Sequence, residues 1–307
     1  MRTAVEKPVS GIQALRRGAP AALAAPVLAA VLLSAGSATG ADTSPTPKAQ
    51  SAPSAAIPPG EAGAKAALET SPRHHEWVDV ALPSAAGKLS LFIAYPERKD
   101  KAPVVLVIHE IYGLTDWIRA VADRLAADGF IAVAPDLLTG RGPGGGGTEK
   151  FASRDDIVRA VRELAPAQVA AALDAAGTYG RSLPAASGKL ATLGFCWGGA
   201  QSFSYATARP ALDAAVVYYG TSPELPALAE LRAPVLGLYG EDDARVNATV
   251  GPAEAQAREL GKTFITATHT GAGHGFLRQQ DGRDGANLAA SLKAWPATVE
   301  FLRQRLE

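Results

Sequence analysis

The stretch that decides the fold is residues 194–199, which reads Gly-Phe-Cys-Trp-Gly-Gly and contains Cys196, the only cysteine among 307 residues. It follows the apolar run of residues 189–193, which suits a short buried strand. A nucleophile with small residues two positions before and after it is typical of the sharp strand-to-helix turn called a nucleophile elbow. Larger side chains at the flanking positions would clash in that turn. The pattern therefore predicts a reactive thiol at a helix N-terminus, where partial positive charge favours the thiolate, rather than a buried structural cysteine.

Apolar segments alternate along the chain with segments of helical periodicity. The expected strands are residues 89–94, 104–108, 130–134, 189–193, 214–219, 235–239 and 264–267, and the expected helices are residues 116–128, 168–179, a segment starting at Gly198, and 288–306. Such alternation predicts an α/β fold with a mostly parallel sheet and helices on both faces. Together with the elbow, it predicts the α/β-hydrolase fold, whose site lies beyond the carboxyl ends of the strands.

The first 72 residues differ in composition from the rest. Residues 1–40 combine Arg16 and Arg17 with an apolar stretch and then small residues, which is the layout of a cleaved secretory signal peptide. An uncleaved anchor or a misassigned start is the alternative. Residues 41–72 are rich in proline, alanine and serine and are expected to form a disordered tether. We therefore expect an exported protein, periplasmic or extracellular, whose hydrolase domain spans residues 73–307 and has no stable membrane anchor.

Charge and cysteine content argue against several classes of function. The 30 basic residues are balanced by 30 acidic ones, so nucleic acid is not an expected partner. A single cysteine excludes an intramolecular disulfide and, without a resolving partner, disfavours a thiol redox protein. The glycine-rich residues 140–147 lack the lysine and hydroxyl residue of a phosphate loop and are expected to be mobile. A small-molecule substrate is expected, with no metal and no organic cofactor.

A cysteine nucleophile needs a base, and the base needs an acid that orients it. In this fold the chain order is nucleophile, acid, histidine, which leaves His269 and His274 among the five histidines. His274 is favoured because it lies in a glycine-rich loop after the last expected strand, where catalytic residues concentrate. The turn after the preceding strand offers three carboxylates, Glu241, Asp242 and Asp243, and the residues alone do not choose among them.

The chain resembles the dienelactone hydrolase family over about residues 75–305. The resemblance is carried by four segments, His109-Glu110-Ile111-Tyr112-Gly113, residues 194–199, Tyr239-Gly240-Glu241-Asp242-Asp243 and Gly271-Ala272-Gly273-His274-Gly275-Phe276. It implies that Asp243 is the acid, that Glu110 controls the thiol proton before substrate binds, and that Arg278 binds a substrate carboxylate. A second arginine of the family has no clear match, and the candidates are Arg141, Arg154 and Arg159.

The predicted function is hydrolysis of a small ester or lactone, dienelactone-like, with an anionic substrate suggested by Arg278. Cys196 would attack the carbonyl with help from His274 and form a thioester acyl-enzyme, while the backbone N–H groups of Ile111 and Trp197 would hold the oxyanion. His274 would then activate water for deacylation. The alternatives are another activity of the same fold, such as a thioesterase, an acyltransferase or a peptidase, or a non-catalytic small-molecule binding protein.

Overall fold

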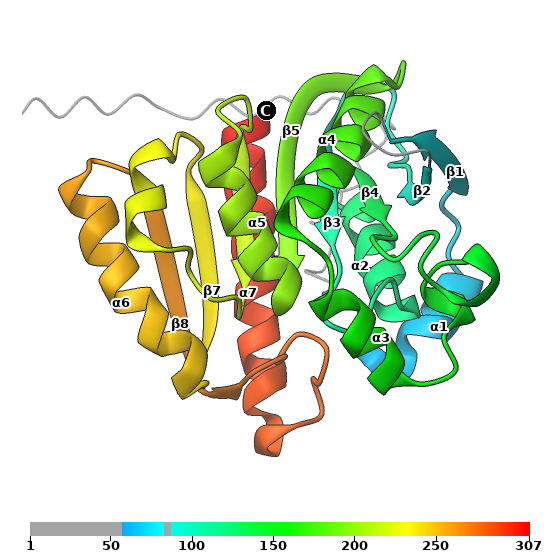
Figure 1. The fold of residues 1–307 in the computed structure, drawn as a ribbon. Helices are drawn as coiled ribbons and strands as arrows, with labels where there is room; N and C mark the ends of the chain where they lie inside the picture. The colour runs from blue at the N-terminus through cyan, green and yellow to red at the C-terminus, as the bar shows by residue number, and fades with distance from the viewer. Residues whose placement is uncertain (1–56, 83–86) are drawn as a thin grey trace, which may run out of the picture. The chain divides into compact units, whose positions relative to one another are not determined.

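The computed structural model describes residues 57–82 and 87–307. The expected signal peptide over residues 1–40, and residues 41–56 of the expected tether, lie outside this part of the chain. In the described part, one eight-stranded sheet has the order β1-β2-β4-β3-β5-β6-β7-β8 (Figure 1). The strands are β1 (His75–Ala81), β2 (Lys88–Ala94), β3 (Ala102–Ile108), β4 (Ile131–Pro135), β5 (Ala186–Phe195), β6 (Ala214–Tyr218), β7 (Val235–Asp242) and β8 (Phe264–Gly273).

Strand direction follows the predicted mostly parallel pattern. Strand β2 pairs antiparallel with β1 and β4, whereas the neighbours from β4 through β3 to β8 are all parallel. The carboxyl ends of β3, β5, β6, β7 and β8 therefore meet at one edge of the sheet, where sites of such sheets are found.

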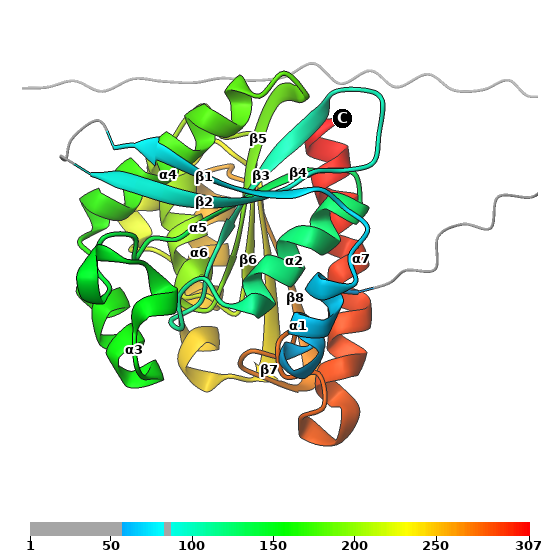
Figure 2. The same ribbon diagram turned by 90° about the vertical axis from the view of Figure 1, so that its right-hand side faces the viewer.

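Helices cover both faces of the sheet, as Figure 2 shows. One face is covered by α2 (Asp116–Ala127) and α7 (Ala286–Leu306), and the other by α4 (Pro166–Ser182), α5 (Trp197–Ala208) and α6 (Ala244–Glu259). Two shorter helices, α1 (Glu61–Glu69) and α3 (Arg154–Arg162), complete the fold, and α1 packs beside α2. This arrangement confirms the predicted α/β-hydrolase architecture. Within residues 57–82 and 87–307, every helix is too short or too polar to cross a bilayer.

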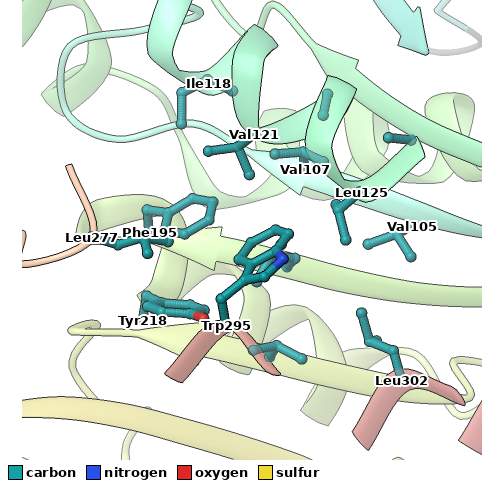
Figure 3. Packing of buried hydrophobic residues seen from close by; sticks show 14 of the residues in the cluster. Val105, Val107, Ile118, Val121, Leu125, Phe195, Tyr218, Leu277, Trp295 and Leu302 are labelled. Atoms are coloured by element: carbon teal, nitrogen blue, oxygen red, sulfur yellow. The ribbon is translucent and has the colours of Figure 1, made fainter. Parts of the chain in front are cut away.

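The core fixes the strands that carry the site. Strand β3 is buried along its whole length because helices cover both of its faces. On the α7 side, Trp295 is inserted among Val105, Val107, Phe195 and Tyr218 (Figure 3). Burial of each such side chain stabilises the fold by about 1.5–3 kcal/mol. The ends of β3 and β5, which hold the loop at Glu110 and the elbow, are therefore rigid supports.

The prediction of a tether is wrong for residues 57–72, because residues Glu61–Glu69 form α1. The helix buries Ala64, and the Trp117 indole donates a hydrogen bond to the carbonyl of Pro59 at 3.1 Å. Alanine, glutamate and lysine are strong helix formers, and a small apolar face is enough when a neighbouring helix receives it. Composition suggested disorder because the partner surface lies on a distant part of the chain.

Three further elements, β1, α3 and α6, were not among the predicted ones. Strand β1 lies at the edge of the sheet with one half-exposed face, so its apolar signal is weak. Helix α3 is short and mostly charged, and α6 contains Gly251 and Pro252, which lower helix propensity. Tertiary packing forms these elements despite weak local preference.

Candidate active site

Cys196 occupies the sharp turn between β5 and α5. Its backbone has φ 55° and ψ −116°, a conformation that costs a non-glycine residue about 1–3 kcal/mol. The surrounding backbone imposes this conformation, because the Cys196 N–H donates to the carbonyl of Tyr218 at 3.0 Å and its carbonyl accepts from Ala200 at 3.2 Å. The half-buried thiol thus lies at the N-terminus of α5.

The glycines around Cys196 have a direct steric cause. A Cβ atom on Gly194 would lie closer than 3.0 Å to the carbonyl oxygen of Gly198. A Cβ atom on Gly198 would lie equally close to the carbonyl oxygens of Ile108 and His109, at the end of β3. The predicted reason for small residues at these positions is confirmed, and the contacts show that the elbow packs against the loop that follows β3.

His274 lies between Cys196 and Asp243. Its Nε2 atom is 3.1 Å from the Cys196 Sγ atom, and its Nδ1 atom is 2.5 Å from Asp243 Oδ2. Asp243 is buried and also caps α6 by accepting a hydrogen bond from the Val246 N–H. The other candidate base, His269, packs its ring against Phe276 and has no hydrogen bond to Cys196 in the described part of the chain.

His274 and Asp243 form an ion pair next to Cys196. Burial acts to lower the pKa of His274, but its contacts with Asp243 and Cys196 outweigh burial and raise that pKa to about 9. Burial acts to raise the pKa of Asp243, and the hydrogen bond and charge of His274 outweigh it and lower that pKa. Asp243 therefore stabilises a positively charged His274 next to the Cys196 sulfur.

The three carboxylates of the turn after β7 have different partners. Glu241 accepts a hydrogen bond from the Gly271 N–H at 2.9 Å, and Asp242 pairs with Arg283. Of the three, Asp243 is the one that contacts His274. The structure therefore brings together Cys196, His274 and Asp243 from three separate loops at the carboxyl edge of the sheet.

Glu110, which follows β3, lies against Arg278 rather than against the thiol. Its Oε2 atom is 2.7 Å from Arg278 Nε, a charge contact whose N–H direction falls short of hydrogen-bond geometry. Its Oε1 atom is buried and has no hydrogen-bond partner within residues 57–82 and 87–307. Burial raises the pKa of Glu110, and the charges of Arg278 and His274 only partly oppose it. Within the same described residues no hydrogen bond joins Glu110 to Cys196, whose Sγ atom lies next to His274 instead, so the expected contact of Glu110 with the thiol proton is not formed.

Two backbone N–H groups, one next to Cys196 in the chain and one in the loop after β3, are the predicted donors to an oxyanion. The rings of His109 and Trp197 stack with their centroids 5.6 Å apart, which holds the loop after β3 against the start of α5. Among the residues that the structure describes, neither the Ile111 N–H nor the Trp197 N–H donates a hydrogen bond. Free donors on two adjacent turns are what an oxyanion hole requires.

Arg278 and Arg154 share a carboxylate that the sequence did not indicate. Arg278 Nη1 donates to Glu61 Oε2 at 2.5 Å, and Arg154 pairs with the other oxygen of Glu61. Both guanidinium groups lie over the ring of Tyr112, at 5.2 Å and 5.0 Å from its centroid. Arg154 is therefore the arginine of the three candidates that the structure brings to Arg278. The other two face Gln168 and Asp156.

Tyr219 is a second residue that the sequence analysis missed. Its φ of 41° is unusual for a residue other than glycine, and its ring lies 5.2 Å from that of His274. Its buried hydroxyl has no hydrogen-bond partner in the described residues. The available signal was its position directly after the strand next to the elbow strand. Its ring limits the orientations open to the histidine.

The described residues hold no group of three or more histidine, cysteine or acidic side chains arranged to bind a metal ion. A cleft of about 790 Å³ is lined by Glu61 and Arg154, among others. Cys196 and His274 are not among its lining residues.

The strand order, the strained turn and the acid–histidine–thiol contact define an α/β-hydrolase with a cysteine in the elbow. Comparison with known proteins narrows this class, because the sequence model of the Dienelactone hydrolase family matches residues 89–306. The chain belongs to the dienelactone hydrolase family and is a hydrolase of esters or lactones.

Individual relatives agree with this assignment. The protein named "Putative carboxymethylenebutenolidase" in Methylorubrum extorquens is 32% identical over 239 residues, which cover 74% of this chain and 80% of the relative. A protein of the same name in Salmonella typhimurium is 31% identical, with 73% and 86% covered. The solved "Putative Dienelactone Hydrolase" of Klebsiella pneumoniae superposes with a TM-score of 0.64 at 28% identity, covering 75% of this chain and 99% of the other.

Proposed function

We propose that this chain hydrolyses a small carboxylic ester or lactone through a thioester acyl-enzyme, with Cys196 as nucleophile, His274 as base and Asp243 as the orienting acid. The observation that carries the proposal is the unbroken line of contacts from Cys196 Sγ to His274 Nε2 at 3.1 Å and from His274 Nδ1 to Asp243 Oδ2 at 2.5 Å. The relatives named as carboxymethylenebutenolidases support a lactone as substrate.

In the first half-reaction the Cys196 sulfur forms a bond to the carbonyl carbon, and the carbonyl oxygen becomes an oxyanion. The free N–H groups of Ile111 and Trp197 are the proposed donors to that oxyanion. As the tetrahedral intermediate collapses, the C–O bond breaks and His274 gives its proton to the leaving oxygen. For a lactone, the leaving oxygen stays attached to the acyl group at the opened ring.

In the second half-reaction His274, now neutral, takes a proton from water, and the hydroxide attacks the thioester carbonyl. The C–S bond breaks and the thiolate is restored beside the imidazolium. Because a thiolate leaves a tetrahedral intermediate more readily than an amine does, this chemistry favours esters, lactones and thioesters over peptides.

The test is turnover of a panel containing an aryl ester, a lactone, a thioester and a peptide amide. Cys196→Ala and His274→Ala should each lower turnover by at least about a thousandfold, because nucleophile and base act as a unit. His269→Ala is the matched control and should stay close to wild type. Mass spectrometry during ester turnover should detect the acyl group on Cys196. Retention of more than a tenth of the rate by Cys196→Ala would contradict the proposal, as would a wild-type protein that cleaves only the peptide.

A further inference from the structure

Helix α1 lies outside the matched family region of residues 89–306, yet its first residue reaches the site. The Glu61 carboxylate uses one oxygen for Arg278, with Oε2 2.5 Å from Nη1, and the other oxygen for Arg154. Two guanidinium groups that converge on one carboxylate form an anion-binding arrangement. In this chain, a side chain of the protein itself fills that arrangement.

The position of Glu61 is fixed by hydrogen bonds on both sides of it. The Glu61 N–H donates to the carbonyl of Arg278 at 2.9 Å, and Gln280 donates to the carbonyl of Pro58 at 2.8 Å. The carbonyl of Pro59, between Pro58 and Glu61 in the sequence, accepts the hydrogen bond from Trp117. The start of α1 is therefore attached to the loop that follows His274, so little entropy is lost when Glu61 meets the arginines.

The charge of Arg278 is already balanced without a substrate. Arg278 is 8% exposed and lies between two carboxylates, those of Glu61 and Glu110. Burial acts to raise the pKa of Glu61, but the charges of Arg278 and Arg154 outweigh it and hold that pKa below its ordinary value. Glu61 therefore stays ionised at neutral pH. A carboxylate on a substrate would add a third negative charge at this position and would have to displace Glu61 to reach Arg278.

Glu61 and Arg278 differ in their access to the neighbouring cleft. The cleft of about 790 Å³ is bordered by Glu61 and Arg154, and Arg278 is not part of its wall. The same cleft is lined by apolar side chains such as Leu114 and Trp117 and by charged ones such as Lys65 and Arg119. A substrate carboxylate that approached from this cleft would meet Glu61, which is part of the wall, before it reached Arg278, which is not.

We propose that Glu61 is a specificity-determining residue, a built-in carboxylate that fills the anion subsite between Arg154 and Arg278 and restricts the enzyme to esters and lactones with an uncharged acyl group. The inference rests on the proposed function, because it assigns the substrate class of the same site. It replaces the expectation of an anionic substrate, since the arginine that would bind the anion is already occupied.

The test compares two esters with the same leaving group, 4-nitrophenyl butyrate and the monoanionic 4-nitrophenyl succinate. Wild type should prefer the neutral ester. Glu61→Gln removes the charge at nearly constant shape and should shift the kcat/KM ratio toward the anionic ester by about tenfold to a hundredfold, mainly through its KM. Glu61→Asp keeps the charge and should keep the preference for the neutral ester. Glu69→Gln, at the exposed far end of the same helix, is the matched control and should leave the ratio unchanged.

A second measurement separates this inference from the proposed mechanism. Succinate binding is followed by calorimetry, which needs no catalysis, in wild type and in Glu61→Gln with matching thermal unfolding. Tighter succinate binding to Glu61→Gln supports the inference even if neither ester is cleaved. A ratio of the two esters within twofold of wild type in folded Glu61→Gln, or equal succinate binding by both proteins, would overturn it.

Discussion

Substitution of Gly198 by alanine should damage both catalysis and stability through a single contact. The added Cβ atom would lie closer than 3.0 Å to the carbonyl oxygens of Ile108 and His109. To restore ordinary van der Waals separation, these oxygens would have to retreat by roughly 1 Å. They belong to the end of β3, directly before the loop that holds Glu110 and Ile111, so the proposed oxyanion donor moves with them.

The expected magnitudes follow from that displacement. Misplacement of a catalytic group by about 1 Å costs on the order of a hundredfold in rate, and we expect kcat to fall by about that factor. Overpacking of a rigid core costs about 1–3 kcal/mol in the free energy of unfolding, which for a domain of this size corresponds to roughly 2–12 °C in the midpoint of thermal unfolding. Turnover of an aryl ester and thermal unfolding by circular dichroism measure the two effects.

Gly251→Ala is the matched control for this substitution. Gly251 lies in α6, and a Cβ atom there would meet nothing within 4 Å. The same chemical change should therefore stabilise the protein by about 0.5–1 kcal/mol and leave turnover unchanged. If Gly198→Ala kept turnover within threefold of wild type and unfolded at the same temperature, the proposed coupling between the elbow and the β3 loop would be refuted.

Three other predictions follow from the site and the N-terminus. Asp243→Asn should lower turnover by about a thousandfold or more by allowing the wrong His274 tautomer, whereas Glu241→Gln should be mild; greater damage from Glu241→Gln in the same assay would reassign the acid. The pKa of His274 is about 9 in the folded state, so between pH 6.5 and pH 9 the folded protein holds a proton on His274 that the unfolded chain has lost. The free energy of unfolding should therefore fall as the pH rises from 6.5 to 9, by roughly 1–2 kcal/mol after a discount for the partial exposure of the His274 side chain. Urea unfolding at pH 6.5 and pH 9 should show this fall in wild type but not in His274→Gln. An equal change in the free energy of unfolding in both proteins would disprove it. Protein recovered from the periplasm or medium should begin after residues 37–41 by N-terminal sequencing, and an intact Met1 on cytoplasmic protein would contradict export.

Features encoded by adjacent residues could be predicted from the sequence. The elbow is one, because its glycines are required by contacts inside the motif and at the neighbouring strand end. The buried strands are another, because both faces of the parallel strands need apolar side chains and leave a continuous signal. His274 could be favoured because its loop follows the last predicted strand. Local sequence and the order of elements were enough for this much of the fold and site.

Features that depend on the direction of a side chain could not be chosen from the residues alone. Glu241, Asp242 and Asp243 are adjacent and chemically alike, and they differ only in whether they face the Gly271 N–H, Arg283 or His274. Glu110 was placed correctly at the end of β3, but its partner, Arg278, could be assigned only once the fold was known. The pairing of Glu61 with Arg278 joins residues 217 positions apart, and nothing near either residue indicates it.

Helix α1 also moves the start of the folded hydrolase domain to a point before residue 73. A buried guanidinium is costly unless its charge and its N–H groups are matched, and Glu110 satisfies only one side of Arg278. Glu61 satisfies the other side, and the carbonyls of Pro58 and Pro59 accept hydrogen bonds from Gln280 and Trp117. A protein cut to residues 73–307, the limits that composition suggested, would leave these donors without their partners and would leave Arg278 Nη1 without its carboxylate. The proposed role of Glu61 in specificity therefore depends on this segment, and substrate preference has to be measured with residues 57–72 in place.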